Sequence, residues 1–361
     1  MINEFNELSL KRKSWVDTTK SNGFDNGIKN LLTELYPDNA HFIYELLQNA
    51  EDTEATEVKF SLKDNELIFQ HNGRDFDFKD IEGITSIGQG TKKDDINKIG
   101  KFGVGFKAIF AYTNTPLIYS NQYNFSINDL VIPIEIDKKN YDYPTTMIFP
   151  FDNKNKEPQI AYQEIKKGLS SIRDNTLLFL KNINKINYEY ENNLNQIMRD
   201  EIDNEKVSIL NSATKEKTNW LRFKQFLPKS NNLFVSIAYK LEENIELKKE
   251  QIVPIDGEVS IYFPAEKETS KLRFHIHAPF SSTVARDSIK DIEENNILRD
   301  LISKLIVESF KYIKENDYLN FNFLQVLPIK EDNLAIFYEP ILLDIIKTFN
   351  NEPYVLVEDK T

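Results

Sequence analysis

The chain has 361 residues, of which 40% are apolar, and it carries 25 Phe, 16 Tyr and a formal net charge of -12. This length exceeds one ordinary core and indicates two domains with a short extension. The absence of cysteine excludes disulfides and thiolate metal sites, and no apolar run approaches the roughly 18 residues of a membrane span. We expect a cytoplasmic protein without a membrane anchor. Its negative charge disfavours non-specific binding to nucleic acid but leaves a local basic groove open.

Helices and strands are predicted to alternate through the first half of the chain. After a polar start, apolar residues at helical spacing predict helices at 27–36, 37–52, 78–84, 103–112 and 160–173. Runs bounded by turn residues predict strands at 56–62, 66–70, 117–119, 130–136 and 146–151. The stretch 87–98 carries Gly, Thr, Lys and Asp without periodicity, which predicts a mobile loop.

The second half reads as a series of short strands followed by helices. Strands are predicted at 186–190, 206–210, 220–226, 234–239, 259–263 and 272–278, with a solvated hairpin at 191–205. Helices are predicted at 296–314 and 341–349. The fold class is therefore α+β, with two layered domains in tandem at 1–175 and 176–330 and a helical extension at 331–361.

The helix ending at residue 52 carries a polar face. Glu45, Asn49 and Asp52 fall within a sector of roughly 60° because their spacing is i, i+4, i+7. A neutral carbonyl-type oxygen one turn from a carboxylate suits a hydrated magnesium ion, and the carboxylate can activate a water. The alternative interpretation is an ordinary solvated helix face.

A glycine-rich segment follows about fifty residues later. Gly100, Gly103 and Gly105 do not directly follow a strand, so a dinucleotide fingerprint fits poorly, and no Gly-Lys-Ser or Gly-Lys-Thr is present for a Walker loop. A turn that delivers backbone amides and a helix N-terminus to a phosphate chain fits better. Close packing of the loop against a sheet is the alternative. With the polar helix, this segment predicts a site for ATP and Mg²⁺.

The order and spacing of four motifs resemble the GHKL ATPase superfamily, which has the Bergerat fold. The motifs are the Glu45 helix, His71-Asn72-Gly73, the loop with Gly88 and Gly90-Thr91-Lys92, and the segment from Gly100 to Phe106. The last is most similar to the sacsin-like and heat-shock-chaperone-like branches, and Thr145-Thr146 resembles a later strand that supports the adenine pocket. The resemblance covers residues 45 to 148 and implies a two-layer ATPase sandwich followed by a ribosomal-protein-like α/β transducer domain.

The resemblance also implies roles for individual residues. Glu45 would be the general base, Asn49 the magnesium ligand, and 87–98 the ATP lid. The remaining positions implied to contact the nucleotide are Asp52, His71, Gly73, Asp75, Gly88, Lys92, Gly100, Phe102, Gly103, Val104, Gly105, Phe106 and Thr146.

One position departs from the family pattern. The family normally carries Asp two residues before the first Gly of its second motif, where the carboxylate accepts a hydrogen bond from the adenine amino group. This chain has His71 there. A neutral imidazole could accept one hydrogen bond, as could a water held by Asp75 or Asp77. The substitution leaves open a lineage variant, an altered base preference, a weakened site or a His that caps a strand end.

A second resemblance lies in the strand-rich half. Residues 278–287 look like the loop of the chaperone middle domain that reaches the γ-phosphate, which would make Arg286 the trans-domain contact. A guanidinium suits the charge that develops on a transferring phosphoryl group. The alternative is a surface Arg paired with Asp287 or Glu294.

These features predict a slow Mg²⁺-dependent ATPase in which lid closure and ATP-dependent homodimerisation act as a conformational switch. A protein client or partner would respond to this conformational change. The alternative is a nucleotide-binding regulatory or scaffolding module that does not hydrolyse ATP, including one with a DNA-associated or defence role. A histidine kinase is disfavoured because no helix pair with a phospho-acceptor His is visible.

Overall fold

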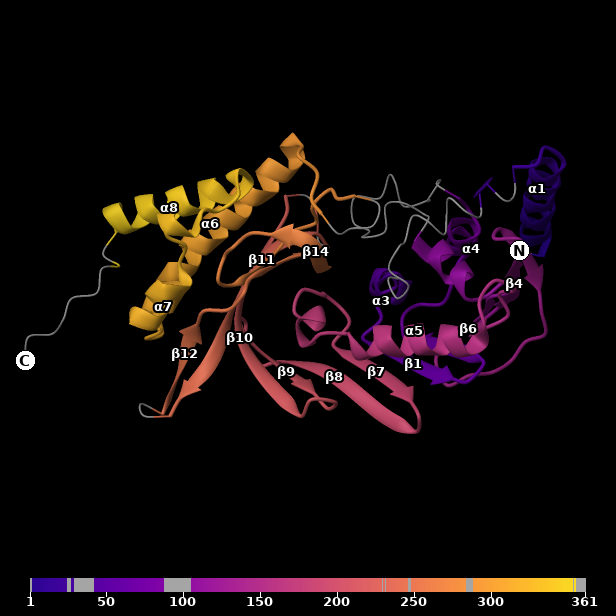
Figure 1. Ribbon diagram of the computed structural model, residues 1–361, viewed down its shortest axis with the longest axis horizontal. Helices are drawn as coiled ribbons and strands as arrows, with labels where there is room; N and C mark the ends of the chain where they lie inside the picture. The colour runs from indigo at the N-terminus through magenta and orange to yellow at the C-terminus, as the bar shows by residue number, and fades with distance from the viewer. Residues whose placement is uncertain are drawn as a thin grey trace, which may run out of the picture. The chain divides into compact units, whose positions relative to one another are not determined.

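The computed structural model describes residues 2–24, 27–28, 42–87, 105–228, 230, 232–245, 248–283, 288–352 and 354. The chain divides into two compact units, each containing both strands and helices (Figure 1). Unit 1 comprises Met1–Arg173 and Leu180–Met198, and unit 2 comprises Asp174–Phe179 and Arg199–Thr361. Among the described helices, none combines the length and apolar character that crossing a bilayer requires.

Unit 1 is built on a mixed sheet in the order β8-β7-β1-β2-β6-β3-β4-β5. β1 and β7 are parallel, and the other neighbouring strands are antiparallel. The strands are β1 (Glu57–Lys63), β2 (Glu66–His71), β3 (Leu117–Ser120), β4 (Tyr123–Asn128), β5 (Ile132–Glu135), β6 (Thr145–Pro150), β7 (Lys185–Tyr190) and β8 (Asn193–Glu201).

The helices of unit 1 pack their apolar side chains into this sheet and into one another. They are α1 (Ile2–Ser21), α3 (Phe42–Asp52), α4 (Phe78–Ile84), the 3₁₀ helix η1 (Gly105–Ala111) and α5 (Pro158–Ser170). α4 begins with a capping box, in which Asp77 and Asp80 each accept the other's backbone amide. This cap satisfies amide groups that the first turn of a helix leaves without partners.

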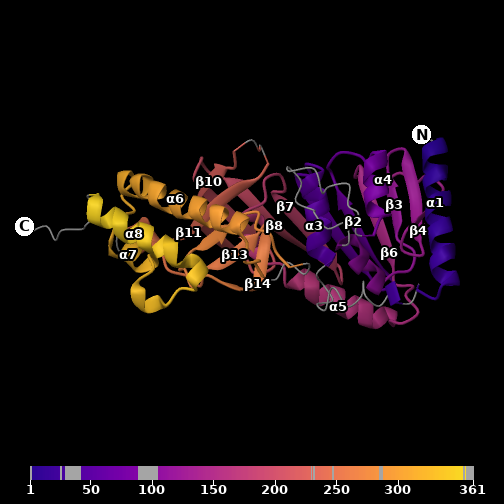
Figure 2. The same cartoon turned by 90° about the horizontal axis from the view of Figure 1, so that it is seen from above.

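Helix α1 occupies the polar start of the chain, where no helix was predicted. It lies beside β4 (Figure 2), where the Phe5 ring is 5.9 Å from the ring of Phe125. Phe5, Leu8 and Val16 are buried, whereas Leu10 is 67% exposed. Because so few of its apolar residues face the sheet, its sequence shows too weak a helical period to be recognised.

The strands of unit 2 lie in the order β14-β13-β15-β11-β10-β9, with β12 paired to β11. β13 and β15 are parallel, and the other neighbouring strands of this unit are antiparallel. Its strands are β9 (Lys206–Asn211), β10 (Glu216–Phe226), β11 (Phe234–Asn244), β12 (Lys249–Val253), β13 (Glu258–Ile261), β14 (Phe263–Thr269) and β15 (His275–His277).

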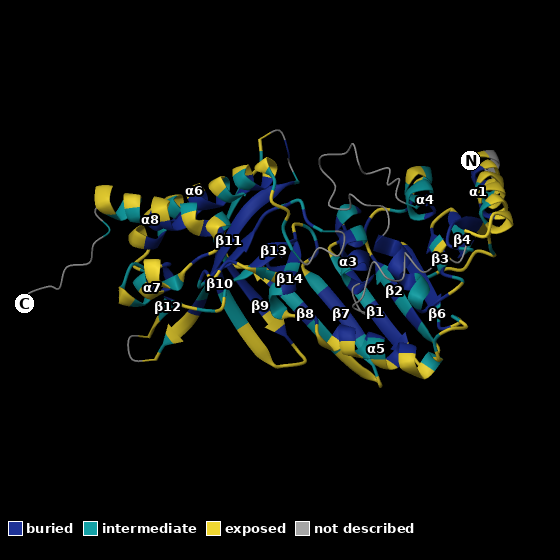
Figure 3. Cartoon of the chain, turned by 45° about the horizontal axis from the view of Figure 1, so that its top comes forward, coloured by how far each residue is buried: buried dark blue, intermediate teal, exposed yellow. Residues whose placement is uncertain are grey.

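The C-terminal helices of unit 2 share one core with these strands. They are α6 (Glu293–Glu315), α7 (Phe321–Val326) and α8 (Glu339–Asn351), accompanied by the 3₁₀ helices η2 (Asp174–Leu177), η3 (Lys330–Asp332) and η4 (Ile336–Tyr338). Ile302, Ile306 and Phe310 of α6 are almost completely enclosed against strand residues such as Ile237. In Figure 3, β11 and β13 are mostly buried, whereas α6 and α8 carry exposed residues.

The α+β class predicted from the sequence is confirmed at this level, as a large mixed sheet with C-terminal helices. The elements that were not predicted include α1, β4, β12, β14 and α7. The predicted hairpin at 191–205 contains a nine-residue strand, β8, that pairs with β7. The predicted helix 103–112 is a short 3₁₀ helix over its described part. The transducer assignment and the domain boundaries remain predictions.

Candidate functional site

Helix α3 holds the first three predicted site residues. Its apolar side chains Leu46 and Leu47 are enclosed, with 1% and 0% exposed. Glu45 lies within this buried surface and is 8% exposed, whereas Asn49 and Asp52 are partly exposed. The burial of a carboxylate in an apolar surface requires a compensating interaction, so the surroundings of Glu45 define the site.

The carboxylate of Glu45 lies directly against the first residue of η1. A Cβ atom built on Gly105 would stand 1.9 Å from Glu45 Oε2 and 2.2 Å from its Cδ. Real side-chain atoms do not approach this closely, so the carboxylate can occupy its present position only because residue 105 is glycine. The structure therefore brings together two motifs that lie far apart in the sequence.

The C-terminal end of α3 makes a second close contact with a glycine. A Cβ atom on Gly73 would stand 2.3 Å from Thr53 Oγ1 and 2.7 Å from the Thr53 carbonyl oxygen. The backbone amide of Arg74 donates to that same carbonyl at 2.9 Å. Gly73 thus holds the chain that leaves β2 against the end of α3.

His71 is the last residue of β2 and is 1% exposed. Its Nδ1 accepts a hydrogen bond from the backbone amide of Gly73, at 3.2 Å. Burial, with the nearby Arg74, lowers the pKa of His71 to about 4, against an opposing effect of Asp80. The imidazole is therefore neutral around pH 7.

A row of polar side chains crosses the sheet at this level. His71 pairs with Thr145 of β6, which pairs with Ser120 of β3, and paired residues share one face of a sheet. The hydroxyls of Thr145 and Ser120 are 2.8 Å apart, and Ser120 Oγ accepts from the Phe76 amide at 2.9 Å. Neither Thr145 nor Ser120 is exposed.

Thr146, the predicted nucleotide contact, lies on the opposite face of the sheet. It pairs with Gln70, whose Nε2 donates to Thr146 Oγ1 at 3.1 Å. The register thus places Thr145, rather than Thr146, beside His71. Side chains alternate between the two faces of a strand. Knowledge of the register between β2 and β6 is therefore needed to choose Thr145 over Thr146.

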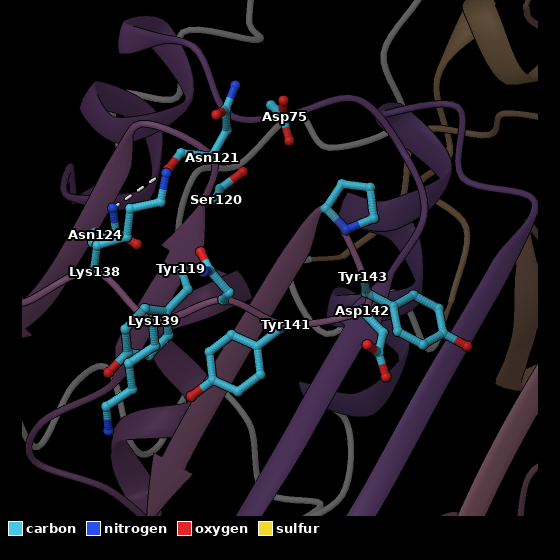
Figure 4. A pocket seen from close by; sticks show the side chains of 12 residues that line it. Asp75, Tyr119, Ser120, Asn121, Asn124, Lys138, Lys139, Tyr141, Asp142 and Tyr143 are labelled. Carbon is cyan, nitrogen blue, oxygen red and sulfur yellow. Dashed lines mark hydrogen bonds between the residues drawn. The ribbon is translucent and has the colours of Figure 1, made fainter.

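Asp75 lines a polar cavity of ≈ 420 Å³ in unit 1 (Figure 4). Tyr119 and Tyr141 pack with ring centroids 5.1 Å apart, and Lys139 Nζ lies 5.9 Å from the Tyr119 ring. The lining residues are Asp75, Tyr119, Ser120, Asn121, Asn124, Lys138, Lys139, Asn140, Tyr141, Asp142, Tyr143 and Pro144. Of the predicted site residues, Asp75 alone lines this cavity among those that the structure describes.

Two buried charged residues near the site were not predicted from the sequence. Glu51, 3% exposed, accepts three backbone amides from residues 181–183, at 2.8, 2.8 and 2.9 Å. This fastens the end of α3 to the chain that enters β7. Its burial could have been read from the helical period, because Glu51 lies one turn after Leu47 on the enclosed face.

Lys107 is the second unpredicted residue, and it is 2% exposed within η1. Its Nζ donates to the Ile84 and Leu130 carbonyl oxygens, each at 2.6 Å. Burial, reinforced by Arg12, lowers the pKa of Lys107 to about 7. Lys107 therefore joins the C-terminal end of α4 to η1.

Magnesium coordination can be tested against the residue types present. Across the described parts of the chain, no group of three or more His, Asp or Glu side chains gathers as a metal cage. Mg²⁺ keeps several waters and takes one or two protein ligands. The carboxamide oxygen of Asn49, one turn from Glu45, is a ligand of this type.

Phe106, another predicted nucleotide contact, is buried. It is 7% exposed, and its ring centroid lies 6.2 Å from that of Phe149.

Several predicted site residues lie outside the described residues. These are Gly88, Lys92, Gly100, Phe102, Gly103, Val104 and Arg286, together with most of the predicted lid at 87–98.

Comparison with known proteins supports the sacsin-like resemblance. Residues 22–133 match the family model described as Sacsin domain. The chain is 26% identical over 298 residues to Protein NO VEIN of Arabidopsis thaliana, covering 72% of this chain and 11% of that protein. It is 33% identical over 115 residues to Sacsin of Homo sapiens, covering 27% of this chain and 2% of that protein. The chain therefore spans a small part of these curated relatives.

A solved structure titled "Crystal Structure of N terminal domain of a DNA repair protein" covers 81% of this chain and 100% of its own, at 12% identity and a TM-score of 0.47. The predicted similarity to the sacsin branch is confirmed: this chain contains a region that matches the Sacsin domain and is homologous to sacsin and NO VEIN.

Proposed function

We propose that this chain binds a purine nucleoside triphosphate with Mg²⁺ and hydrolyses it slowly, as a sacsin-like member of the GHKL ATPases. ATP is the nucleotide that the resemblance implies. The observation that supports this most strongly is the contact of the Glu45 carboxylate with Gly105. It joins the two motifs that the proposal assigns to water activation and to phosphate binding.

In the proposed reaction, Glu45 takes a proton from a water molecule. The water oxygen forms a bond to the γ-phosphorus, and the bond from that phosphorus to the bridging oxygen breaks, which releases inorganic phosphate and the diphosphate. Mg²⁺, held by Asn49 and waters, would offset the phosphate charge when bound. The buried Glu45 carboxylate lies beside Gly105, and positioning of the reacting groups is a large part of catalysis in phosphoryl transfer.

The remaining parts of the proposed switch come from the resemblance. Residues 87–98 would close as a lid over the nucleotide, and Arg286 would contact the γ-phosphate. Closure would promote a homodimer, and its output would reach a protein client or partner. Light scattering with and without a β,γ-imido triphosphate measures the dimer: a nucleotide-dependent doubling of mass is expected, and an unchanged mass contradicts it.

Phosphate release tests the hydrolytic proposal. Wild type and Glu45→Gln are compared with ATP and with GTP, each with Mg²⁺ and again with excess EDTA. Because the carboxamide of the variant cannot accept the proton, we expect release slower by a factor of about 100 or more, with nucleotide binding retained. Arg286→Ala is measured in parallel and is expected to slow release without abolishing binding.

Glu54→Gln provides a matched control, because Glu54 is an exposed carboxylate just beyond the same helix. Its release rate is expected to equal that of wild type. If wild type binds nucleotide but releases phosphate no faster than Glu45→Gln, hydrolysis is excluded and a non-hydrolysing regulatory or scaffolding module takes its place.

A further inference from the structure

Helix α3 has a close glycine contact near each end, and the two contacts define the length of the proposed nucleotide site. Glu45 meets Gly105 at one end, and Thr53 meets Gly73 at the other. The spacing from Glu45 to Thr53 corresponds to about 12 Å along a helix axis. This is the length scale of a nucleoside triphosphate, so a γ-phosphate beside Glu45 directs the base toward Gly73.

The base end contains a histidine whose tautomer is fixed by the backbone. The Gly73 amide donates to His71 Nδ1 at 3.2 Å, which requires a lone pair on Nδ1. A neutral imidazole carries one ring proton. That proton is therefore on Nε2, and the ring presents a hydrogen-bond donor there rather than an acceptor.

The neutral form follows from the surroundings of the ring. His71 is 1% exposed, and its ring centroid lies 5.9 Å from that of Phe69. Burial lowers the pKa of His71 to about 4, so the doubly protonated ring is rare at pH 7. A doubly protonated ring would also direct an N–H at the Gly73 amide.

The hydroxyls beside His71 add to the donors at this end. Ser120 Oγ and Thr145 Oγ1 share one hydrogen bond, which uses one of their two hydroxyl protons. Ser120 Oγ already accepts the Phe76 amide, so the second hydroxyl proton is available to a further acceptor. This hydroxyl pair therefore adds one potential donor on the sheet face that carries His71.

We propose that the base subsite beside His71 reads an oxygen at position 6 of a purine, so that guanine or hypoxanthine binds in preference to adenine. This inference depends on the proposed function, because it requires a nucleotide in the site. The 6-oxo group accepts the Nε2 proton directly. The 6-amino group of adenine would face that proton with its own, and a buried donor without an acceptor weakens binding.

Calorimetric titration with the β,γ-imido analogues of ATP, GTP and ITP tests this preference at about pH 7.5 with Mg²⁺. We expect the GTP and ITP analogues to bind wild type about tenfold more tightly than the ATP analogue, the effect of one mispaired buried group. ITP separates the 6-oxo group from the 2-amino group of guanine. Tighter binding of the ATP analogue, or equal binding of all three, overturns the inference and leaves the proposed function standing.

Two variants of matched size separate the hydrogen-bond effect from a packing effect. His71→Asp supplies only acceptors when ionised, so its preference is expected to reverse toward the ATP analogue. His71→Asn keeps a donor and is expected to retain the 6-oxo preference. Urea unfolding confirms that both variants fold. Identical preferences in the two variants would overturn the inference, and wild type that binds none of the three analogues at millimolar concentration would overturn the proposed function as well.

Discussion

Helices α3 and α6 each bury one face, but the buried side chains of the two helices differ in polarity. α6 in unit 2 buries mostly hydrocarbon, as in Ile302, Ile306 and Phe310. α3 in unit 1 is about half as long and buries Glu45, Gln48 and Glu51 among its apolar residues. Because a buried carboxylate costs free energy unless it is compensated, α3 depends on polar partners such as the backbone amides bonded to Glu51, whereas α6 depends on hydrocarbon packing. We attribute the difference to the proposed site on α3.

The first test of this comparison is to remove a buried apolar side chain from α6. Phe310 is 1% exposed and packs its ring 5.7 Å from that of Phe323. Phe310→Ala is expected to lower the free energy of unfolding by about 4 kcal/mol, through lost transfer free energy and the remaining cavity. Urea unfolding measures the loss. A change below about 1 kcal/mol would show that α6 is not the apolar counterpart of α3.

The second is to alter the carboxylate at the end of α3. Glu51→Gln replaces one acceptor oxygen with an NH₂ group that faces backbone donors. We expect a loss of about 3 kcal/mol, because buried amides lose their partner. The exposed Glu54→Gln is the matched control and is expected to change stability by less than about 0.5 kcal/mol. Equal effects in the two variants would contradict the role given to Glu51.

The third is the pH dependence of stability. The folded pKa of His71, about 4, is below its ordinary value of 6.5. The unfolded state therefore binds more protons between these values, so the stabilising contribution is present above pH 6.5 and is lost as pH falls toward 4. The loss for this buried group is on the order of 2 kcal/mol.

Unfolding curves of His71→Asn across the same pH window are expected to show a shallower slope than wild type. His277, whose pKa burial also lowers, to about 3, remains in both proteins and cancels in the difference. Parallel slopes for wild type and variant would contradict the buried neutral state of His71.

The smallest expected effect comes from adding one methyl group at Gly105. The new Cβ would overlap the Glu45 carboxylate, which is the end of a flexible side chain and can move. Gly105→Ala is therefore expected to cost under about 1 kcal/mol of stability but to slow phosphate release about tenfold, or about 1.4 kcal/mol in the barrier. Gly27→Ala is the matched control, because its Cβ would meet no atom within 4 Å. Unchanged turnover in Gly105→Ala would separate Glu45 from the reaction.

The sequence predicted the parts of this molecule that depend on local spacing. The position of Glu45 on a helix follows from helical periodicity, and Gly73 and Gly105 follow from motif spacing. The sequence did not predict α1, because its few buried residues give a weak period. It also did not separate Thr145 from Thr146, because that choice depends on which face of β6 meets His71. The role of Lys107 and the partners of Glu51 were missed because both side chains bond to backbone groups, which cannot be recognised from residue types.

The bonds of Lys107 have a consequence for the chain between α4 and η1. The ammonium group holds the carbonyl of Ile84, a residue 23 positions earlier, at 2.6 Å. Residues 84 and 107 are thus joined within the folded protein. The entropic cost of bringing these two positions together is therefore part of the free energy of folding and does not reduce the affinity for a ligand.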